Sequence, residues 1–159
     1  MWMIFHKPSP VGMLTLSSDG TALTGLWLDG QKYFGAGLPD AVKETDLPVF
    51  EQASAWLDAY FAKAPLPALP PLAPQGSPFR QAVWQLLLEI PYGTVTTYGA
   101  LAQKLRDRGI SAAAQAVGGA VGHNPISILI PCHRVVGSDG SLTGYAGGVA
   151  KKQFLLELE

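Results

Sequence analysis

Apolar residues fall into short runs over the first part of the chain. Residues 2–5, 11–17 and 22–28 are rich in apolar and β-favouring residues, and Pro, Ser-Asp-Gly and Asp-Gly signals separate them. This pattern predicts a small antiparallel sheet. Between Val49 and Phe61 the apolar positions follow helical spacing, which predicts a helix that covers one face of this sheet. Together these elements predict a compact α+β unit.

A proline-rich stretch divides the chain. Residues 64–78 contain six prolines, which exclude a regular helix or a central strand and favour an extended linker. We therefore expect two domains, an N-terminal α+β domain with its linker over residues 1–75 and a second domain over residues 76–159.

Helical spacing dominates the second part. Ser77 is a good N-cap for a helix with apolar positions from Phe79 to Ile90, and Thr97 can cap a second helix. Ser111 is expected to cap a third helix over residues 111–122, which is packed with alanine and glycine. Because two of these helices are joined by a turn, the fold class is α+β with a mainly helical, winged helix-turn-helix-like C-terminal domain.

The end of the chain predicts two further elements. The segments HRVV, GSDG and SLTGY are typical of a hairpin, and Val149 to Glu159 predicts a final helix. In that helix we expect Phe154, Leu155 and Leu158 to face inward.

Composition and charge narrow the class of protein. The chain has no apolar run of the roughly 18 residues needed to span a bilayer, and its start lacks the layout of a signal peptide, so we expect a cytoplasmic protein without a membrane partner. The overall net charge of −1 hides an asymmetry. Residues 1–75 carry four basic and seven acidic side chains, whereas residues 76–159 carry seven basic and five acidic ones. This mildly basic second half is weak evidence for a polyanionic partner.

The single cysteine, Cys132, lies in the sequence IPCHRVV beside His133. One cysteine forms no internal disulfide and no thiolate cage, and the three histidines have no ligand spacing, so we predict neither a metal nor a cofactor. A lone cysteine is more often inert packing than a nucleophile. A neighbouring imidazole changes this balance, because it can accept a proton and lower the pKa of the thiol toward neutrality. Adjacent residues of a regular strand point to opposite faces, but Pro131 favours an irregular backbone there.

Two long motifs carry a resemblance to a known family. The segments SPFRQAVWQLLLEIPYGTVTTYGALA and AVGGAVGHNPISILIPCHRVVGSDGSLTGYAGGVAKKQFLLELE resemble the O6-alkylguanine-DNA alkyltransferases, also called methylated-DNA–protein-cysteine methyltransferases, from residue 77 to the end. The first half resembles the family more loosely.

The resemblance implies direct-reversal repair of DNA. An alkyl group would pass irreversibly from O6 of guanine, and by the same chemistry from O4 of thymine, to Cys132, with one turnover per molecule. The enzyme would act as a monomer on double-stranded DNA that carries O6-alkylguanine, bound through the minor groove. The residues implied as catalytic are Cys132, His133, Glu159, Tyr98 and Asn124. The residues implied as substrate-binding are Val135, Tyr145, Ala146 and Gly147. The residues implied as DNA-binding are Gln115, Ser111, Ala114, Ala116, Gly118, Gly119 and Arg134.

The chain departs from the family at Gln115. The family usually has an arginine there, which fills the place of the flipped nucleotide, and glutamine lacks the cationic stacking plane of a guanidinium. We therefore expect weaker or slower base flipping.

Three other functions remain open at this stage. The first is a non-catalytic sensor of alkylated bases, which keeps the pocket without the transfer. The second is a winged-helix transcription regulator, which does not account for PCHRV and Glu159. The third is a small-molecule cysteine hydrolase, which lacks a second His or an Asp/Asn signature.

Overall fold

The structure is a computed structural model that describes residues 2–39, 42–142 and 145–159. Its N-terminal part is a four-stranded sheet in the order β3-β2-β1-β4. The strands are β1 (Trp2–Lys7), β2 (Leu14–Ser18), β3 (Leu23–Leu28) and β4 (Val42–Glu44). The first three are antiparallel neighbours, as predicted, whereas β4 joins β1 in parallel. The sequence pattern missed β4 because three residues are too few to show alternation.

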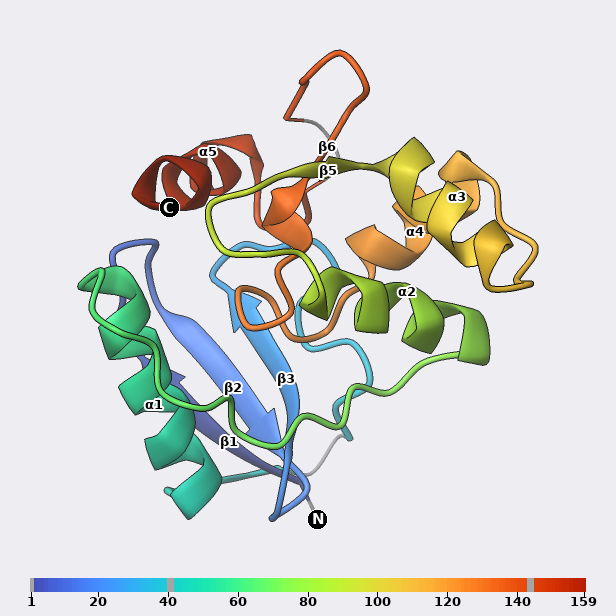
Figure 1. The fold of residues 1–159 in the computed structure, drawn as a ribbon. Helices are drawn as coiled ribbons and strands as arrows, with labels where there is room; N and C mark the ends of the chain where they lie inside the picture. The colour runs from blue at the N-terminus through green and yellow to red at the C-terminus, as the bar shows by residue number, and fades with distance from the viewer. Residues whose placement is uncertain (1, 40–41, 143–144) are drawn as a thin grey trace.

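The sheet is covered on both faces. Helix α1 (Pro48–Phe61), close to the predicted bounds, packs on one face, where the ring of Phe50 stacks on Phe5 with centroids 5.6 Å apart (Figure 1). Every residue of β2 and β3 is buried, which a sheet with one solvated face would not allow. The second half of the chain therefore supplies the other cover.

The proline-rich segment is extended, as its composition predicts, but it is docked on the edge of β3. The backbone N–H of Leu23 donates to the carbonyl of Pro71 at 2.9 Å, and that of Ala73 donates to the carbonyl of Leu23 at 2.7 Å. Farther along β3, Leu26 exchanges backbone hydrogen bonds with Pro125 and Ser127. Because an unpaired edge strand invites aggregation, this pairing protects β3 and holds the two halves together.

Four α-helices form the second half. They are α2 (Pro78–Leu88), α3 (Tyr98–Asp107), α4 (Ala114–Gly122) and α5 (Val149–Leu158). The predicted caps of the first two are confirmed, since the hydroxyls of Ser77 and Thr97 accept backbone hydrogen bonds at 3.2 and 3.1 Å. The predicted cap of α4 is wrong. Ser111 is exposed and α4 begins only at Ala114, because residue 113 is extended and the Arg106 guanidinium holds the carbonyl of residue 112 at 2.7 Å.

Two expectations for the C-terminal segment are also corrected. The turn over residues 137–141 forms, but β6 (Val135–Val136) pairs in parallel with β5 (Thr96–Thr97) instead of closing a hairpin. Of the hairpin's second arm, residues 143–144 lie outside the described residues. Phe154 is 39% exposed, because the inward face of α5 carries Lys152 and Leu155, with Leu158 half-buried.

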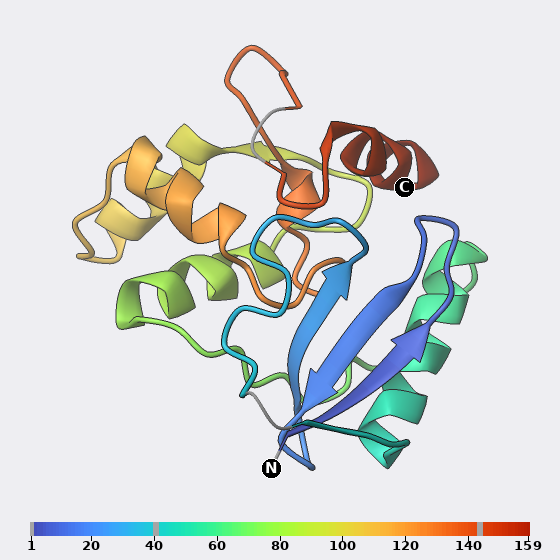
Figure 2. The same ribbon diagram turned by 180° about the vertical axis from the view of Figure 1, so that it is seen from behind.

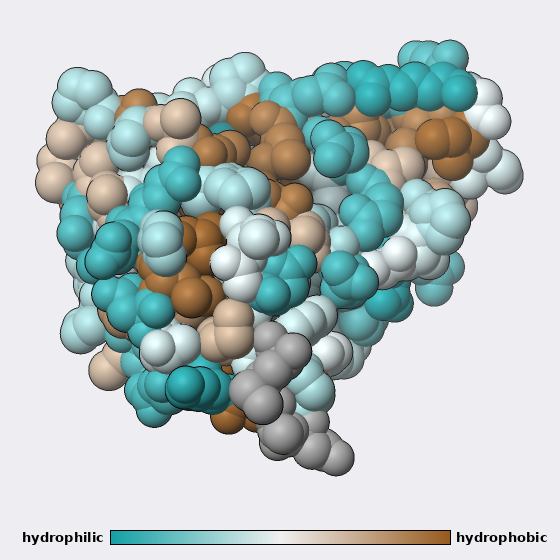
Figure 3. Space-filling model, turned by 90° about the horizontal axis from the view of Figure 1, so that it is seen from below, coloured by the Kyte–Doolittle hydropathy of each residue, from teal (hydrophilic) through white to brown (hydrophobic). Residues whose placement is uncertain are grey.

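Among the described helices, none is both long enough and apolar enough to cross a membrane. Seen from below, apolar residues reach the surface in separate patches between polar ones (Figure 3).

The packing of β3 predicts the effect of one substitution. The indole of Trp27 lies directly over Gly25, and a Cβ atom added at Gly25 would overlap the ring. Gly25→Ala should therefore destabilise the protein by about 1–3 kcal/mol, seen as a lower midpoint in urea. Gly99→Ala is the control, because its Cβ would meet nothing within 4 Å and alanine favours the helix. Equal stability of the two variants would contradict the packing described.

Candidate active site

Cys132 opens a short 3-10 turn, η1 (Cys132–Arg134), not a strand. Pro131 has φ −80° and ψ 64°, and the N–H of Arg134 donates to the carbonyl of Pro131 at 3.0 Å. Because the turn removes the alternation of a strand, Cys132, His133 and Arg134 are all buried. Their side chains then reach different partners.

Glu159 organises the partners of this turn. Its side chain is 1% exposed and accepts from the Nε2 side of His133 at 2.6 Å. Arg134 binds the carboxylate through Nε at 2.8 Å and Nη2 at 3.1 Å, and its Nη1 donates to the carbonyl of Ile90 at 2.8 Å. The hydroxyl of Tyr60, from α1, donates to Glu159 Oε2 at 2.7 Å. We call Tyr60, His133, Arg134 and Glu159 the carboxylate cluster.

The electrostatics of the cluster keep His133 uncharged. Burial lowers the pKa of His133. The Glu159 carboxylate raises this pKa by stabilising the imidazolium, whereas the nearby Arg134 cation lowers it. The pKa of Glu159 lies well below its ordinary value because His133, Arg134 and Tyr60 donate hydrogen bonds that outweigh its burial. With Nε2 turned to Glu159, the other ring nitrogen of His133, Nδ1, is buried and has no partner among the described residues.

The thiol of Cys132 is a neutral group in this environment. Burial raises its pKa to about 11, although a hydrogen bond from Asn124 and the positive charge of Lys152 act in the opposite direction. The expectation that His133 lowers the pKa of the thiol toward neutrality is therefore corrected. Desolvation is the larger effect, and His133 is directed to Glu159.

Asn124 ties the end of α4 to the loop that leads to Cys132. Its amide donates to the carbonyls of Ile126 and Ile130 at 3.3 and 2.9 Å, and its carbonyl oxygen accepts from the N–H of Ile126 at 3.0 Å. Two tyrosines interact electrostatically with Cys132. The pKa values of Tyr98 and Tyr145 are raised first by burial and then by the charge that Cys132 would carry as a thiolate. Both phenols therefore keep their protons at neutral pH.

Lys152 is a member of the site that the sequence reasoning missed. Its side chain is fully buried in α5, and its ammonium donates to the carbonyl of Val135 at 2.5 Å. Burial lowers its pKa, while the charge of a Cys132 thiolate would raise it. Its spacing of three from Leu155 and seven from Glu159, on one helix face, was the available signal. Tyr60 belongs to the apolar positions that predicted the helix between Val49 and Phe61, but nothing local indicated its hydrogen bond.

A cavity of about 280 Å³ lies beside Tyr145 and Ala146, two of the residues expected to bind the substrate. It is lined by Tyr145 and Ala146, by residues of α4 and by Lys32 and Tyr33 of the loop after β3, whereas Cys132 does not line it. Figure 2 shows that loop between the sheet and the helical half. The N–H of Lys32 donates to the carbonyl of Ala146 at 2.8 Å. A side chain at Gly147 would press on the Tyr145 ring, so glycine is required there.

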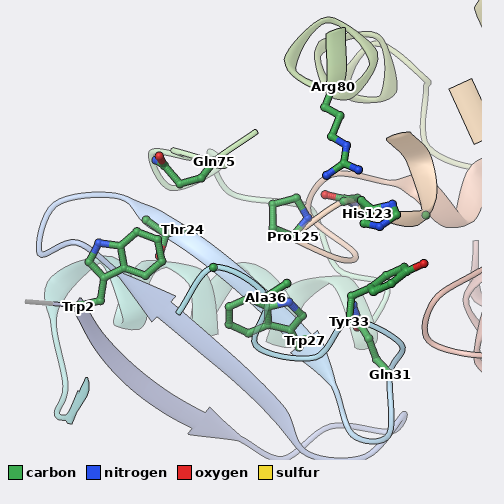
Figure 4. A pocket seen from close by; sticks show the side chains of 13 residues that line it. Trp2, Thr24, Trp27, Gln31, Tyr33, Ala36, Gln75, Arg80, His123 and Pro125 are labelled. Atoms are coloured by element: carbon green, nitrogen blue, oxygen red, sulfur yellow. The ribbon is translucent and has the colours of Figure 1, made fainter. Parts of the chain in front are cut away.

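An aromatic pair separates this cavity from a second one of about 180 Å³ between the two halves. The rings of Tyr33 and His123 stack with centroids 4.0 Å apart, and both line both cavities. Figure 4 shows the pair beneath Arg80, which reaches into the second cavity from α2. Among the described residues, no group of His, Cys, Asp and Glu is arranged to hold a metal.

The residues expected to face DNA lie in two places. Ala114, Gln115, Ala116 and Gly119 form an exposed and nearly bare surface of α4, with Ser111 exposed just before it. Gly118 is half-buried near the Tyr98 ring. The expectation that Arg134 faces DNA is corrected. Its guanidinium is held by Glu159 and by the carbonyl of Ile90 in the buried cluster and is not on the α4 surface.

Two family models together match almost the whole chain. The DNA binding domain of 6-O-methylguanine DNA methyltransferase matches residues 78–159, and the ribonuclease-like domain of the same family matches residues 6–74. The chain belongs to the 6-O-methylguanine DNA methyltransferase family.

Individual members of the methyltransferase family match over most of their length. The methylated-DNA–protein-cysteine methyltransferase of Haemophilus influenzae is 46% identical over 97% of this chain and 84% of its own length. That of Methanosarcina acetivorans is 43% identical over 95% and 94%. A crystal structure of Mycobacterium tuberculosis OGT in complex with DNA is 42% identical, with a TM-score of 0.86 over 98% of this chain and 91% of the other. The α+β fold class predicted from the sequence is thereby confirmed.

The ionisation of Glu159 predicts how stability depends on pH. Because its folded pKa is depressed, Glu159 stabilises the protein fully above its ordinary pKa of 4.5, and this stabilisation is lost as pH falls below that value. Glu159→Gln should therefore lower the free energy of unfolding at pH 7 by about 3–5 kcal/mol. The decrease in this free energy between pH 5 and pH 3 should also be smaller in the variant than in the wild type. Urea unfolding across this range measures both effects. An unchanged acid dependence would contradict the role of this carboxylate.

Proposed function

We propose that this protein repairs DNA by direct reversal, moving an alkyl group from O6 of guanine to Cys132 in a single irreversible event. The observation that carries the proposal is the arrangement around the thiol in a member of this family. A buried cysteine interacts electrostatically with two protonated tyrosines, and the next residue is a histidine that is held by a buried carboxylate. The names of the curated relatives support the same activity.

The chemistry is one displacement at the alkyl carbon. The sulfur–carbon bond forms as the carbon–oxygen bond breaks, and the bonding electron pair remains on guanine. The thiol proton passes through a water to His133, whose Nδ1 is the ring nitrogen not engaged by Glu159. Tyr98 gives the leaving guanine a proton, and the proton that the thiol gave to His133 finally returns to Tyr98, so the proton lost by the thiol balances the one gained by guanine. Glu159 then stabilises the imidazolium that forms.

Burial of the thiol makes substrate binding part of the reaction. Since the pKa of Cys132 is raised to about 11, little thiolate exists in the free protein at neutral pH. Lys152 is the buried cation whose charge favours the anion. Because a thioether is a poor leaving group, the alkylated cysteine is not regenerated and each molecule acts once.

We propose that the base reaches the site by flipping out of the duplex. The bare surface of α4 around Gln115 allows the close approach that the minor groove requires, and a damaged base is the least costly to extrude. The base would then contact Tyr145 and Ala146, which line the 280 Å³ cavity, together with Gly147 and Val135. O4-alkylthymine offers the same reacting carbon and is a second substrate.

We propose that the chain is divided into two domains, residues 1–75 and residues 76–159, and that the second domain carries DNA binding and alkyl transfer. The two family matches meet between residues 74 and 78, which supports this boundary. The protein is proposed to act as a cytoplasmic monomer. A non-catalytic damage sensor is the alternative function, and the presence of Cys132 in this arrangement disfavours it.

Intact-protein mass separates these two functions. After mixing with a duplex that contains O6-methylguanine, the wild-type protein should gain the mass of one methyl group, located on the Cys132 peptide. Cys132→Ala should bind the same duplex and gain nothing, because it lacks the nucleophile. Binding without any gain of mass by the wild type would support the sensor.

The side chain at position 115 is expected to affect the rate of base flipping and, through it, the rate of methyl transfer. Gln115→Arg restores a cationic stacking plane and should raise the single-turnover rate of methyl transfer by about 3–10-fold at limiting DNA. Gln115→Ala should lower it. Rapid-quench measurements on one duplex give both rates, and equal rates for all three proteins would exclude a role of this side chain in extrusion.

A further inference from the structure

Tyr60 brings the N-terminal half of the chain into the carboxylate cluster. Its hydroxyl lies 2.7 Å from Glu159 Oε2, although 99 positions separate the two residues in the sequence. The same oxygen is bound by His133 Nε2 at 2.6 Å, and the Tyr60 oxygen is 3.5 Å from that nitrogen. The phenol and the imidazole therefore share one acceptor atom.

The direction of this hydrogen bond follows from the ionisation of both partners. Burial and the neighbouring Glu159 charge raise the pKa of Tyr60 far above its ordinary value, so the phenol stays protonated. The pKa of Glu159 is depressed, so its carboxylate accepts. Tyr60 is then a donor throughout the pH range in which the protein would work.

The Tyr60 ring is held independently of this hydrogen bond. It stacks on Trp56 with centroids 5.3 Å apart and an interplanar angle of 10°, and it meets Phe61, Tyr92 and His133 edge-on. The residue is 1% exposed. Because the packing fixes the ring, the hydroxyl is aimed at Glu159 without further loss of conformational freedom, and a phenylalanine would fill the same space.

The shared oxygen links Tyr60 to the basicity of His133. Each donor to Glu159 withdraws electron density from the carboxylate and makes it a weaker partner for an imidazolium. The titratable or charged groups packed around His133 come from three elements, and they are Tyr60 of α1, Cys132 and Arg134 of η1, and Lys152 and Glu159 of α5. Of these, only Tyr60 belongs to the N-terminal half.

We infer that Tyr60 is a positioning residue for alkyl transfer, which orients the Glu159 carboxylate and sets how strongly it supports protonation of His133. The inference rests on the proposed function and gives the N-terminal half a part in the chemistry at the thiol. The part is indirect, because Tyr60 acts through Glu159 and not on the base.

Tyr60→Phe tests the inference by removing one oxygen atom. The Glu159 carboxylate then loses one of the hydrogen bonds that hold its orientation toward His133, and this loss of positioning should lower the single-turnover rate of methyl transfer by about tenfold at neutral pH. With one donor fewer, the carboxylate becomes a stronger base and raises the pKa of His133. The acidic limb of the pH–rate profile should therefore move to higher pH, since His133 must be neutral to accept the thiol proton.

Tyr92→Phe is the matched control. It removes a hydroxyl from the neighbouring ring, which meets Tyr60 edge-on and has no hydrogen bond to Glu159 among the described residues. Its rate and pH profile should equal those of the wild type. If both variants slow transfer equally with an unshifted profile, the effect of Tyr60 is one of packing and the inference is wrong.

The Glu159→Gln background provides a second test. There the route through the carboxylate is absent, so adding Tyr60→Phe should not slow transfer further, whereas an additive loss would overturn the inference.

If Tyr60→Phe does not fold, 3-fluorotyrosine at position 60 replaces it. Because its hydroxyl is a stronger donor, the acidic limb of the pH–rate profile should move to lower pH. An unmoved limb would also overturn the inference. Absence of methyl uptake by the wild type would instead overturn the proposed function.

Discussion

The buried carboxylate of Glu159 is the interaction on which the rest of the site depends. It joins α5 to η1 through His133 and Arg134, to α1 through Tyr60, and to the loop after α2 through the N–H of Gly93 at 3.1 Å. A buried carboxylate is tolerated only when its lone pairs are satisfied, and here donors from three separate segments satisfy it. The final helix, the cysteine turn and the N-terminal half are thus fixed in one geometry.

The charges near the thiol explain why its reactivity needs a bound substrate. Arg134 neutralises Glu159, so the carboxylate does not hold His133 as a permanent cation, and the thiol remains protonated in its buried position. Lys152 is the remaining buried cation, and its ammonium is tied to the backbone of Val135. The pair of Cys132 thiolate and Lys152 would therefore be neutral overall, which makes transient formation of the anion less costly than burial alone suggests.

Local signals in the sequence predicted the local features of the fold. The helices α2 and α3 were found because apolar spacing and a cap residue, Ser77 or Thr97, agree within a few positions. Ser111 failed as a cap because Arg106, on the preceding helix, holds the backbone in between. The partner of Val135–Val136 and the contact of Tyr60 with Glu159 join distant segments, which periodicity does not encode. The resemblance supplied Glu159 and Asn124, whereas the packing revealed Lys152 and the buried position of Arg134.

The dependence of alkyl transfer on Glu159 is the most direct test of this account. The single-turnover rate of methyl transfer from duplex DNA to Cys132 should be compared for the wild type and Glu159→Gln at pH 7.5, below the unfolding temperature of both. A loss of the support for the His133 imidazolium predicts a rate lower by about 10²–10⁴-fold, with the methyl group still found on the Cys132 peptide. Transfer at the wild-type rate by Glu159→Gln would contradict the account.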